Sequence, residues 1–196
     1  MAFGNSLSLI RKMGRSIVLP VDTIKTICKR VLKGKNIERI LDFGSGTLFW
    51  TDLFIKELKC NVCAVDKYYD GLMMPVNDNM KYYSSLSACF IENSHFSFIW
   101  VCDVLHHLSP LDMDFFFKET CNRTDIMIIK DIDANHKFGN SINRLHDKII
   151  NRETVHNIDP DCLMHNMESF GYKTTYYYIP KIFYPHFMVI GIREGG

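Results

Sequence analysis

The sequence lacks several features that would place the protein in a specialised class. No apolar run in its 196 residues approaches the roughly 20 residues that a membrane-spanning helix needs. Residues 1–15 carry Arg11, Lys12 and Arg15 without a long apolar run beside them, which is not the pattern of a secretory signal peptide. The 23 basic and 22 acidic side chains give a formal net charge of +1, so no overall positive field favours nucleic acid. We therefore expect no integral membrane segment and no nucleic-acid partner.

The seven cysteines also lack the paired spacing of a disulfide framework, and their odd number predicts free thiols in a reducing cytoplasm. The close pair Cys60 and Cys63 has no second pair at zinc-site spacing, and an extended strand would direct its thiols to opposite faces. His146, His156 and His165 are too widely spaced to indicate a metal site. These patterns predict a cytoplasmic protein without a metal centre.

What the sequence does contain is an alternation of short apolar runs with helix-compatible segments. We expect strands at residues 40–43, 61–65, 80–83, 96–102, 126–130, 173–179 and 186–192. Helical spacing occurs at 6–17, 21–33, 48–58 and 111–121, and a further helix is capped by Asp159, opened by Pro160 and closed by Gly171. Residues 139–150 fit a helix or an irregular lid. The last two strands are joined by a short turn, which allows an antiparallel pair.

The stretch Arg39-Ile-Leu-Asp-Phe-Gly-Ser-Gly-Thr47 joins a β-type run to a Gly-x-Gly turn, and a helix-compatible segment follows. Asp66 ends the next apolar run, 22 positions after Gly44. A strand, a glycine turn, a helix, a second strand and a terminal acid describe a nucleoside-binding βαβ unit. Leu48 stands where a third glycine often lies, which counts against the dinucleotide-binding fingerprint.

The order of these motifs resembles that of the class I S-adenosylmethionine-dependent methyltransferases, over roughly residues 36–193. The resemblance lies in Ile40–Gly46 as the first motif, Val65-Asp66 at the end of the second strand, Trp100–Leu108 around the fourth, and Ser169–Tyr172 before the sixth. It implies a Rossmann-like α/β three-layer sandwich on a mostly parallel seven-stranded sheet of order 3-2-1-4-5-7-6, with strand 7 antiparallel. It also implies an N-terminal helical cap over residues 1–35, a methyltransferase domain over 36–196 and a cap insert around 134–158.

The resemblance further implies which residues hold S-adenosylmethionine. The glycine turn would border the methionine part, Asp42 would face its amino group, Asp66 would accept from both ribose hydroxyls, and the turn after strand three would contact adenine. The full set is Asp42, Gly44, Ser45, Gly46, Asp66, Lys67, Ser84, Ser85, Leu86, Cys102 and Asp103. A carboxylate offers two acceptor oxygens, which suits a vicinal diol. Asp42 as a helix-capping acid and Asp66 as a solvated strand end remain the alternatives.

Candidate catalytic residues follow strands four and five. A histidine of the Leu105-His-His-Leu108 segment often lies near the methyl donor in the family, and an imidazole suits removal of an acceptor proton. We select His107, and expect at least one of His106 and His107 to be a buried or capping imidazole. His146 is a second candidate base, and Asp131 or Asp133 is its expected carboxylate partner.

These expectations combine into S-adenosylmethionine-dependent methyl transfer to a small-molecule acceptor, with S-adenosylhomocysteine as product. Cys102–Leu105 stands in place of the Asn-Pro-Pro-Tyr type motif of many amino-methylating enzymes, which argues against DNA adenine or protein glutamine as the acceptor. The Leu-His-His segment resembles that of methyltransferases of metabolites, lipids and natural products, so we expect an acceptor of this kind. Two alternatives stay open: an NAD(P)-dependent oxidoreductase, and a non-catalytic S-adenosylmethionine-binding module. The sequence does not indicate the oligomeric state or whether oxygen, nitrogen or carbon is methylated.

Overall fold

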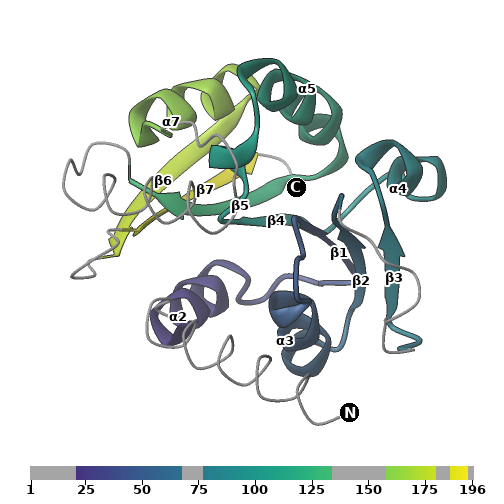
Figure 1. The fold of residues 1–196 in the computed structure, drawn as a ribbon. Coiled ribbons are helices and arrows are strands. Elements are labelled where there is room, and N and C mark those ends of the chain that lie inside the picture. Colours follow the sequence, from purple (N-terminus) through teal and green to yellow (C-terminus); the bar gives the residue numbers. More distant parts are fainter. Residues whose placement is uncertain (1–20, 68–76, 134–157, 180–185, 194–196) are drawn as a thin grey trace, which may run out of the picture.

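Seven strands join one sheet in the computed structural model, which describes residues 21–67, 77–133, 158–179 and 186–193 (Figure 1). The strand order is β3-β2-β1-β4-β5-β7-β6. The strands are β1 (Arg39–Phe43), β2 (Asn61–Val65), β3 (Met80–Tyr83), β4 (Phe98–Cys102), β5 (Ile126–Ile132), β6 (Tyr172–Ile179) and β7 (His186–Arg193). Only β7 runs antiparallel to its neighbours β5 and β6 among the described strands. The predicted sheet order and the reversed last strand are confirmed.

Helices cover both faces of this sheet, as Figure 1 shows. On one face lie α2 (Val21–Val31) and α3 (Phe49–Leu58), and on the other lie α4 (Leu86–Glu92), α5 (Pro110–Thr120) and α7 (Pro160–Ser169). The strands supply both cores because successive side chains point to opposite faces. In β4, Phe98 and Trp100 pack with the α2 and α3 side, whereas Ile99 and Val101 pack with the other helices.

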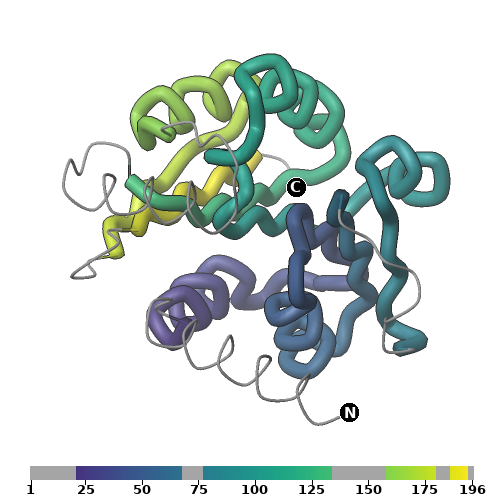
Figure 2. Tube along the Cα trace, in the orientation of Figure 1, coloured from purple at the N-terminus to yellow at the C-terminus, as the bar shows by residue number. Residues whose placement is uncertain are grey.

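The centre of the sheet is buried on both faces. Strands β1 and β4 lie side by side although their paired residues are 58 positions apart in sequence, with Ile40 opposite Phe98 and Phe43 opposite Val101 (Figure 2). Residues 98–101 of β4 and 127–131 of β5 are fully buried. Such strands read as continuous apolar runs because neither face meets water. Lys130 and Asp131, near the carboxyl end of β5, are charged residues in this otherwise apolar buried run, and the functional site begins there.

Most predicted helix ends are confirmed to within two residues. Asp159 caps α7 by accepting hydrogen bonds from the backbone amides of Asp161 and Cys162, and Gly171 follows the helix with a φ of +84°. Ser109 caps α5, which begins at Pro110 rather than at Leu111. One helix was not predicted. Residues 84–86 were expected to lie in a loop, but α4 begins at Leu86, and the Ser85 hydroxyl accepts from the Ala88 amide at 3.2 Å.

Several predictions fall on residues outside the described part. These are the helix at 6–17, the segment at 139–150, His146 and nearly all of the cap insert around 134–158. Helix α2 belongs to the region predicted as an N-terminal cap, and its Ile24 and Cys28 pack into the same core as β1 and β4. The limits of the cap and of the methyltransferase domain stay predictions. Among the described residues, no helix is both long and apolar enough to cross a membrane.

Candidate cofactor and active site

A cavity of about 970 Å³ opens at the carboxyl ends of β1, β2, β3 and β4. Its volume suits a cofactor, because small-molecule sites typically occupy about 300–1,000 Å³. Nine of the residues predicted from the sequence line it: Gly44, Gly46, Asp66, Lys67, Ser84, Ser85, Leu86, Asp103 and His107. Apolar walls come from Phe43, Val65, Val104, Leu108, Phe115 and Phe116. Asp42, Ser45, Cys102 and Asp131 are not among the residues that line it.

The glycine turn forms one edge of the cavity. The amides of Gly44 and Ser45 both donate to the Val65 carbonyl, at 2.8 and 3.1 Å, which fixes the turn against the end of β2. Gly44 has a φ of +73°, and a Cβ added to it would lie 2.0 Å from Cγ2 of Val104. Glycine is therefore needed twice at this position, for its backbone conformation and for its missing side chain.

The same turn orients the acid of β2. The Gly46 amide donates to Oδ2 of Asp66 at 2.8 Å, so the carboxylate is aligned along the cavity edge before any ligand arrives. Leu48, at the place of the expected third glycine, has a φ of +62° and is buried. The chain thus keeps the left-handed conformation there without the residue that adopts it most easily.

Asp42 lies beneath the turn, with 2% of its surface exposed. Its Oδ2 accepts a hydrogen bond from the Thr51 hydroxyl on α3 at 2.5 Å, which ties β1 to that helix. Burial raises the pKa of Asp42 to about 7, although the Thr51 hydrogen bonds lower it and the charge of Asp66 raises it slightly further. This contact with the first turn of α3 is closer to the alternative role of Asp42 as a helix-capping acid than to a contact with the cofactor. The expected role at the cofactor's amino group stays a prediction.

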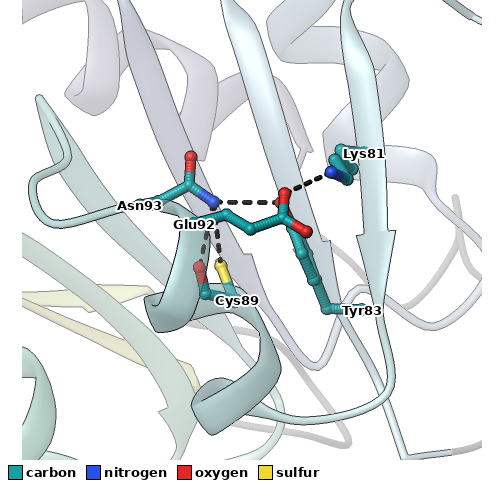
Figure 3. Close-up of polar contacts among 5 residues, drawn as sticks. All are labelled: Lys81, Tyr83, Cys89, Glu92 and Asn93. Carbon is teal, nitrogen blue, oxygen red and sulfur yellow. Dashed lines mark hydrogen bonds and ion pairs between the residues drawn. The ribbon is translucent and has the colours of Figure 1, made fainter.

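Another part of the lining is formed by Ser84, Ser85 and Leu86, which join β3 to α4. Polar contacts link these two elements (Figure 3). The Tyr83 hydroxyl donates to Glu92 at 3.0 Å and accepts from the Asn93 side chain at 3.0 Å.

Asn93 also donates to the Cys89 carbonyl at 3.0 Å, and Lys81 forms an ion pair with Glu92. Burial raises the pKa of Tyr83, and its hydrogen bond to Glu92 raises it further, so the hydroxyl keeps its proton at neutral pH. These contacts set the angle at which α4 leaves β3, and so place this part of the lining.

An ion pair forms the floor. Asp103 follows β4 with a φ of +55°, and its Oδ1 lies 2.5 Å from the Nζ of Lys130, which is fully buried. Burial alone would raise the pKa of Asp103, but the charges of Lys130, His186 and His106 outweigh burial, and the pKa is lowered. Burial raises the pKa of the neighbouring Cys102 thiol well above its usual value, so Cys102 is not a reactive thiolate.

Two histidines follow this floor in the short 3-10 turn η1 (Leu105–His107). His107 lines the cavity, whereas His106 is buried, with its Nδ1 2.5 Å from Oδ1 of Asp131. The expectation of at least one buried imidazole is confirmed in His106. Asp131 or Asp133 was expected to pair with His146, which lies outside the described residues, so that pairing stays a prediction. Among the described residues, Asp131 contacts His106.

The sequence held one signal for this contact. Strands β4 and β5 are neighbours, with Cys102 opposite Lys130, so residues just after β4 meet residues at the end of β5. The described residues contain no group of three or more His, Cys, Asp or Glu side chains arranged to hold a metal ion.

No protein-family model matches the chain, and neither does any curated protein sequence. Solved structures do match. A S-adenosylmethionine-dependent methyltransferase from Archaeoglobus fulgidus is 14% identical, with a TM-score of 0.64, over 94% of this chain and 99% of that one. The methyltransferase domain of bacterial CtHen1 is 18% identical, with a TM-score of 0.63, over 87% of this chain and 97% of that one.

Magnesium protoporphyrin IX methyltransferase from Synechocystis, solved with bound S-adenosylhomocysteine, is 12% identical. Its TM-score is 0.62, over 88% of this chain and 82% of that one. Each of these likenesses extends over most of both chains rather than over one motif. From its sheet order and these likenesses, we conclude that the chain has the fold of the class I S-adenosylmethionine-dependent methyltransferases.

Proposed function

We propose that the protein is a S-adenosylmethionine-dependent methyltransferase that acts on a small-molecule acceptor. The observation that carries the proposal is the arrangement of Gly44, Gly46 and Asp66 at one edge of the cavity. Gly44 has no side chain where its backbone packs against Val104, and the Gly46 amide donates a hydrogen bond to the Asp66 carboxylate. A cofactor with a ribose diol fits an acid placed in this way at the end of β2.

Another part of the lining fits the rest of a nucleoside. Ser84 and Ser85 offer polar groups, and Leu86 offers an apolar surface, in the lining of the same cavity. Lys130 neutralises Asp103, and Asp66 and Asp112 outnumber Lys67 among the remaining charged residues of the lining. This negative balance favours a cofactor that carries a positive sulfonium and an ammonium. These residues would hold S-adenosylmethionine, while Asp42 and Ser45 would support the turn from behind.

S-adenosylmethionine, when bound, supplies a methyl group that is already activated by the positive sulfur. The protein therefore has mainly to align an acceptor with that methyl group. An oxygen or nitrogen acceptor also loses a proton as its bond to the methyl group forms, and His107 is the imidazole that lines the cavity. We assign His107 as the group that takes this proton. Asp131 contacts His106 and does not line the cavity, so it would act through that residue. His146 stays a candidate base from the sequence.

A small acceptor is favoured by the Leu105–Leu108 segment and by the near-neutral charge of the chain. Among the similar structures, the Synechocystis protein is named for magnesium protoporphyrin IX, and the DhpI structure is a complex with S-adenosylmethionine and HEP, at 13% identity and a TM-score of 0.58. These names describe those proteins. For this chain they support a small molecule as the acceptor class.

Calorimetric titration with S-adenosylhomocysteine tests the proposal. The wild-type protein should bind it. Asp66→Asn should weaken the affinity at least tenfold, because an amide has one uncharged acceptor oxygen for the ribose hydroxyls where the carboxylate has two charged ones. Asp78→Asn is the matched control, since Asp78 is an exposed acid in the turn before β3. Binding of NAD in place of S-adenosylhomocysteine by the folded protein would contradict the proposal.

A further inference from the structure

Behind His107 lies a buried pair of ionisable groups that the proposed reaction does not use directly. His106 and Asp131 are 5% and 0% exposed, and the Nδ1 of His106 lies 2.5 Å from Oδ1 of Asp131. The same carboxylate oxygen accepts from the Ile132 amide at 2.8 Å. The other oxygen of this carboxylate, Oδ2, is buried and has no hydrogen-bond partner among the described residues. A positively charged imidazole at Oδ1 would supply the pairing that a buried carboxylate needs.

The second observation is the contact between the two histidines. The ring centroids of His106 and His107 are 4.1 Å apart at an interplanar angle of 43°, and the Nδ1 of His107 is buried. His107 meets the cavity, whereas His106 does not. The Asp131 carboxylate on β5 therefore contacts the buried ring of His106, and that ring contacts the ring of His107, which lines the cavity.

We propose that His106 and Asp131 form a positioning pair for His107. Asp131 holds the ring of His106 in place and keeps it positively charged. His106 then fixes the ring of His107 by contact, and its charge opposes a second positive charge on His107. His107 consequently remains neutral, and able to accept a proton, at lower pH than it otherwise would. The chemical consequence rests on the proposed function, because His107 is the proton acceptor there.

Other charged groups surround the two rings. Asp103 after β4 is paired with Lys130 on β5, and His186 on β7 lies close enough to affect the pKa of Asp103. Asp112 from α5 lines the cavity with His107, and Asp133 follows β5.

The Asp103–Lys130 pair carries no net charge, and the substitutions below leave Asp103, Lys130, Asp112 and Asp133 in place. A change in the titration of His107 in the variants below therefore reports on His106.

The test measures the titration of His107 by proton NMR, which requires no acceptor. The His107 signal is identified as the one missing from His107→Gln. In His106→Gln, which keeps an amide that can donate to Asp131 but removes the charge, the midpoint of the His107 titration should rise by about one pH unit. In Asp131→Asn it should also rise, by less, because both charges of the pair are lost together.

His95→Gln is the matched control, because His95 is exposed and precedes β4, at the opposite end of that strand. It should leave the midpoint unchanged. A purely structural role for His106 would broaden or weaken the His107 signal but would not move its midpoint. An unchanged midpoint in both His106→Gln and Asp131→Asn would overturn the proposal.

A measurement on the wild-type protein covers the case in which these variants do not fold. The ¹⁵N shifts of the His106 ring at pH 7.5 should show an imidazolium, and a neutral ring would overturn the proposal equally. S-adenosylhomocysteine binding is followed in the same samples. If the wild-type protein does not bind S-adenosylhomocysteine, the proposed function is contradicted. The midpoints of the His107 titration would still decide whether His106 and Asp131 act as a pair.

Discussion

Replacement of Asp42 by Asn should change how the stability of the protein depends on pH. The pKa of Asp42 is raised from 3.8 to about 7, chiefly by burial beneath the glycine turn. A carboxyl group with a raised folded-state pKa binds its proton more tightly in the folded chain than in the unfolded chain. Its contribution is therefore fully present below about pH 4 and is lost as the pH rises through about 7.

The size of this loss follows from the two pKa values. They differ by about 3 units, and each unit corresponds to about 1.4 kcal/mol, so ionisation of Asp42 costs the folded state up to about 4 kcal/mol at pH 8. Asn cannot ionise, and its side-chain oxygen can still accept the hydrogen bond from Thr51. Any cost of burying the new amide is the same at every pH.

Urea unfolding followed by tryptophan fluorescence measures the effect, because Trp50 and Trp100 pack against each other in the core beside α3. The free energy of unfolding of Asp42→Asn, minus that of the wild-type protein, should rise by several kcal/mol between pH 4.5 and pH 8.5. Asp52→Asn, at an exposed position of α3, should change stability by less than about 0.5 kcal/mol. A difference for Asp42→Asn that is constant across this pH range would refute the reasoning.

Three further substitutions test individual contacts. Gly44→Ala should destabilise the fold and reduce S-adenosylhomocysteine affinity at least tenfold by calorimetry, because its Cβ would lie 2.0 Å from Val104; Gly34→Ala, with a φ of +78° and no atom within 4 Å of its Cβ, should leave affinity intact. Tyr83→Phe should cost about 1–3 kcal/mol in chemical denaturation, because Asn93 loses a buried hydrogen-bond partner; equal stability of the variant would argue against this contact. Lys130→Met should cost about 1–3 kcal/mol, because the partly exposed Asp103 loses its charged hydrogen-bond partner; Lys118→Met, at an exposed ion pair on α5, should cost less than about 1 kcal/mol.

The sheet and the cofactor end of the fold could be predicted because their signals are local. A strand such as Ile40–Phe43 followed by Gly44 and Gly46 marks its own carboxyl end, and in a parallel sheet these ends gather at one edge. Asp66 and Asp103 could be placed at the cavity on that basis alone. Helix α4 was missed because it has seven residues, fewer than a hydrophobic period needs to stand out.

The partners of the buried polar groups could not be predicted, because their contacts depend on neighbouring strands and on helix packing. Lys130 lies in an apolar strand and its partner Asp103 is 27 positions away, while His106 meets Asp131 across 25 positions. Asp42 meets Thr51 only because α3 packs back onto β1. In each case the sequence supplied the ionisable residue, and the sheet register or the packing of a helix decided which group it faces.

A crystal structure of the protein with S-adenosylhomocysteine tests the central claim most directly. The account predicts that the ribose hydroxyls lie within hydrogen-bond distance of Asp66, that the sulfur lies beside the glycine turn, and that the adenine ring lies against Ser84–Leu86. A ligand bound elsewhere, or with its ribose turned away from Asp66, would contradict the account.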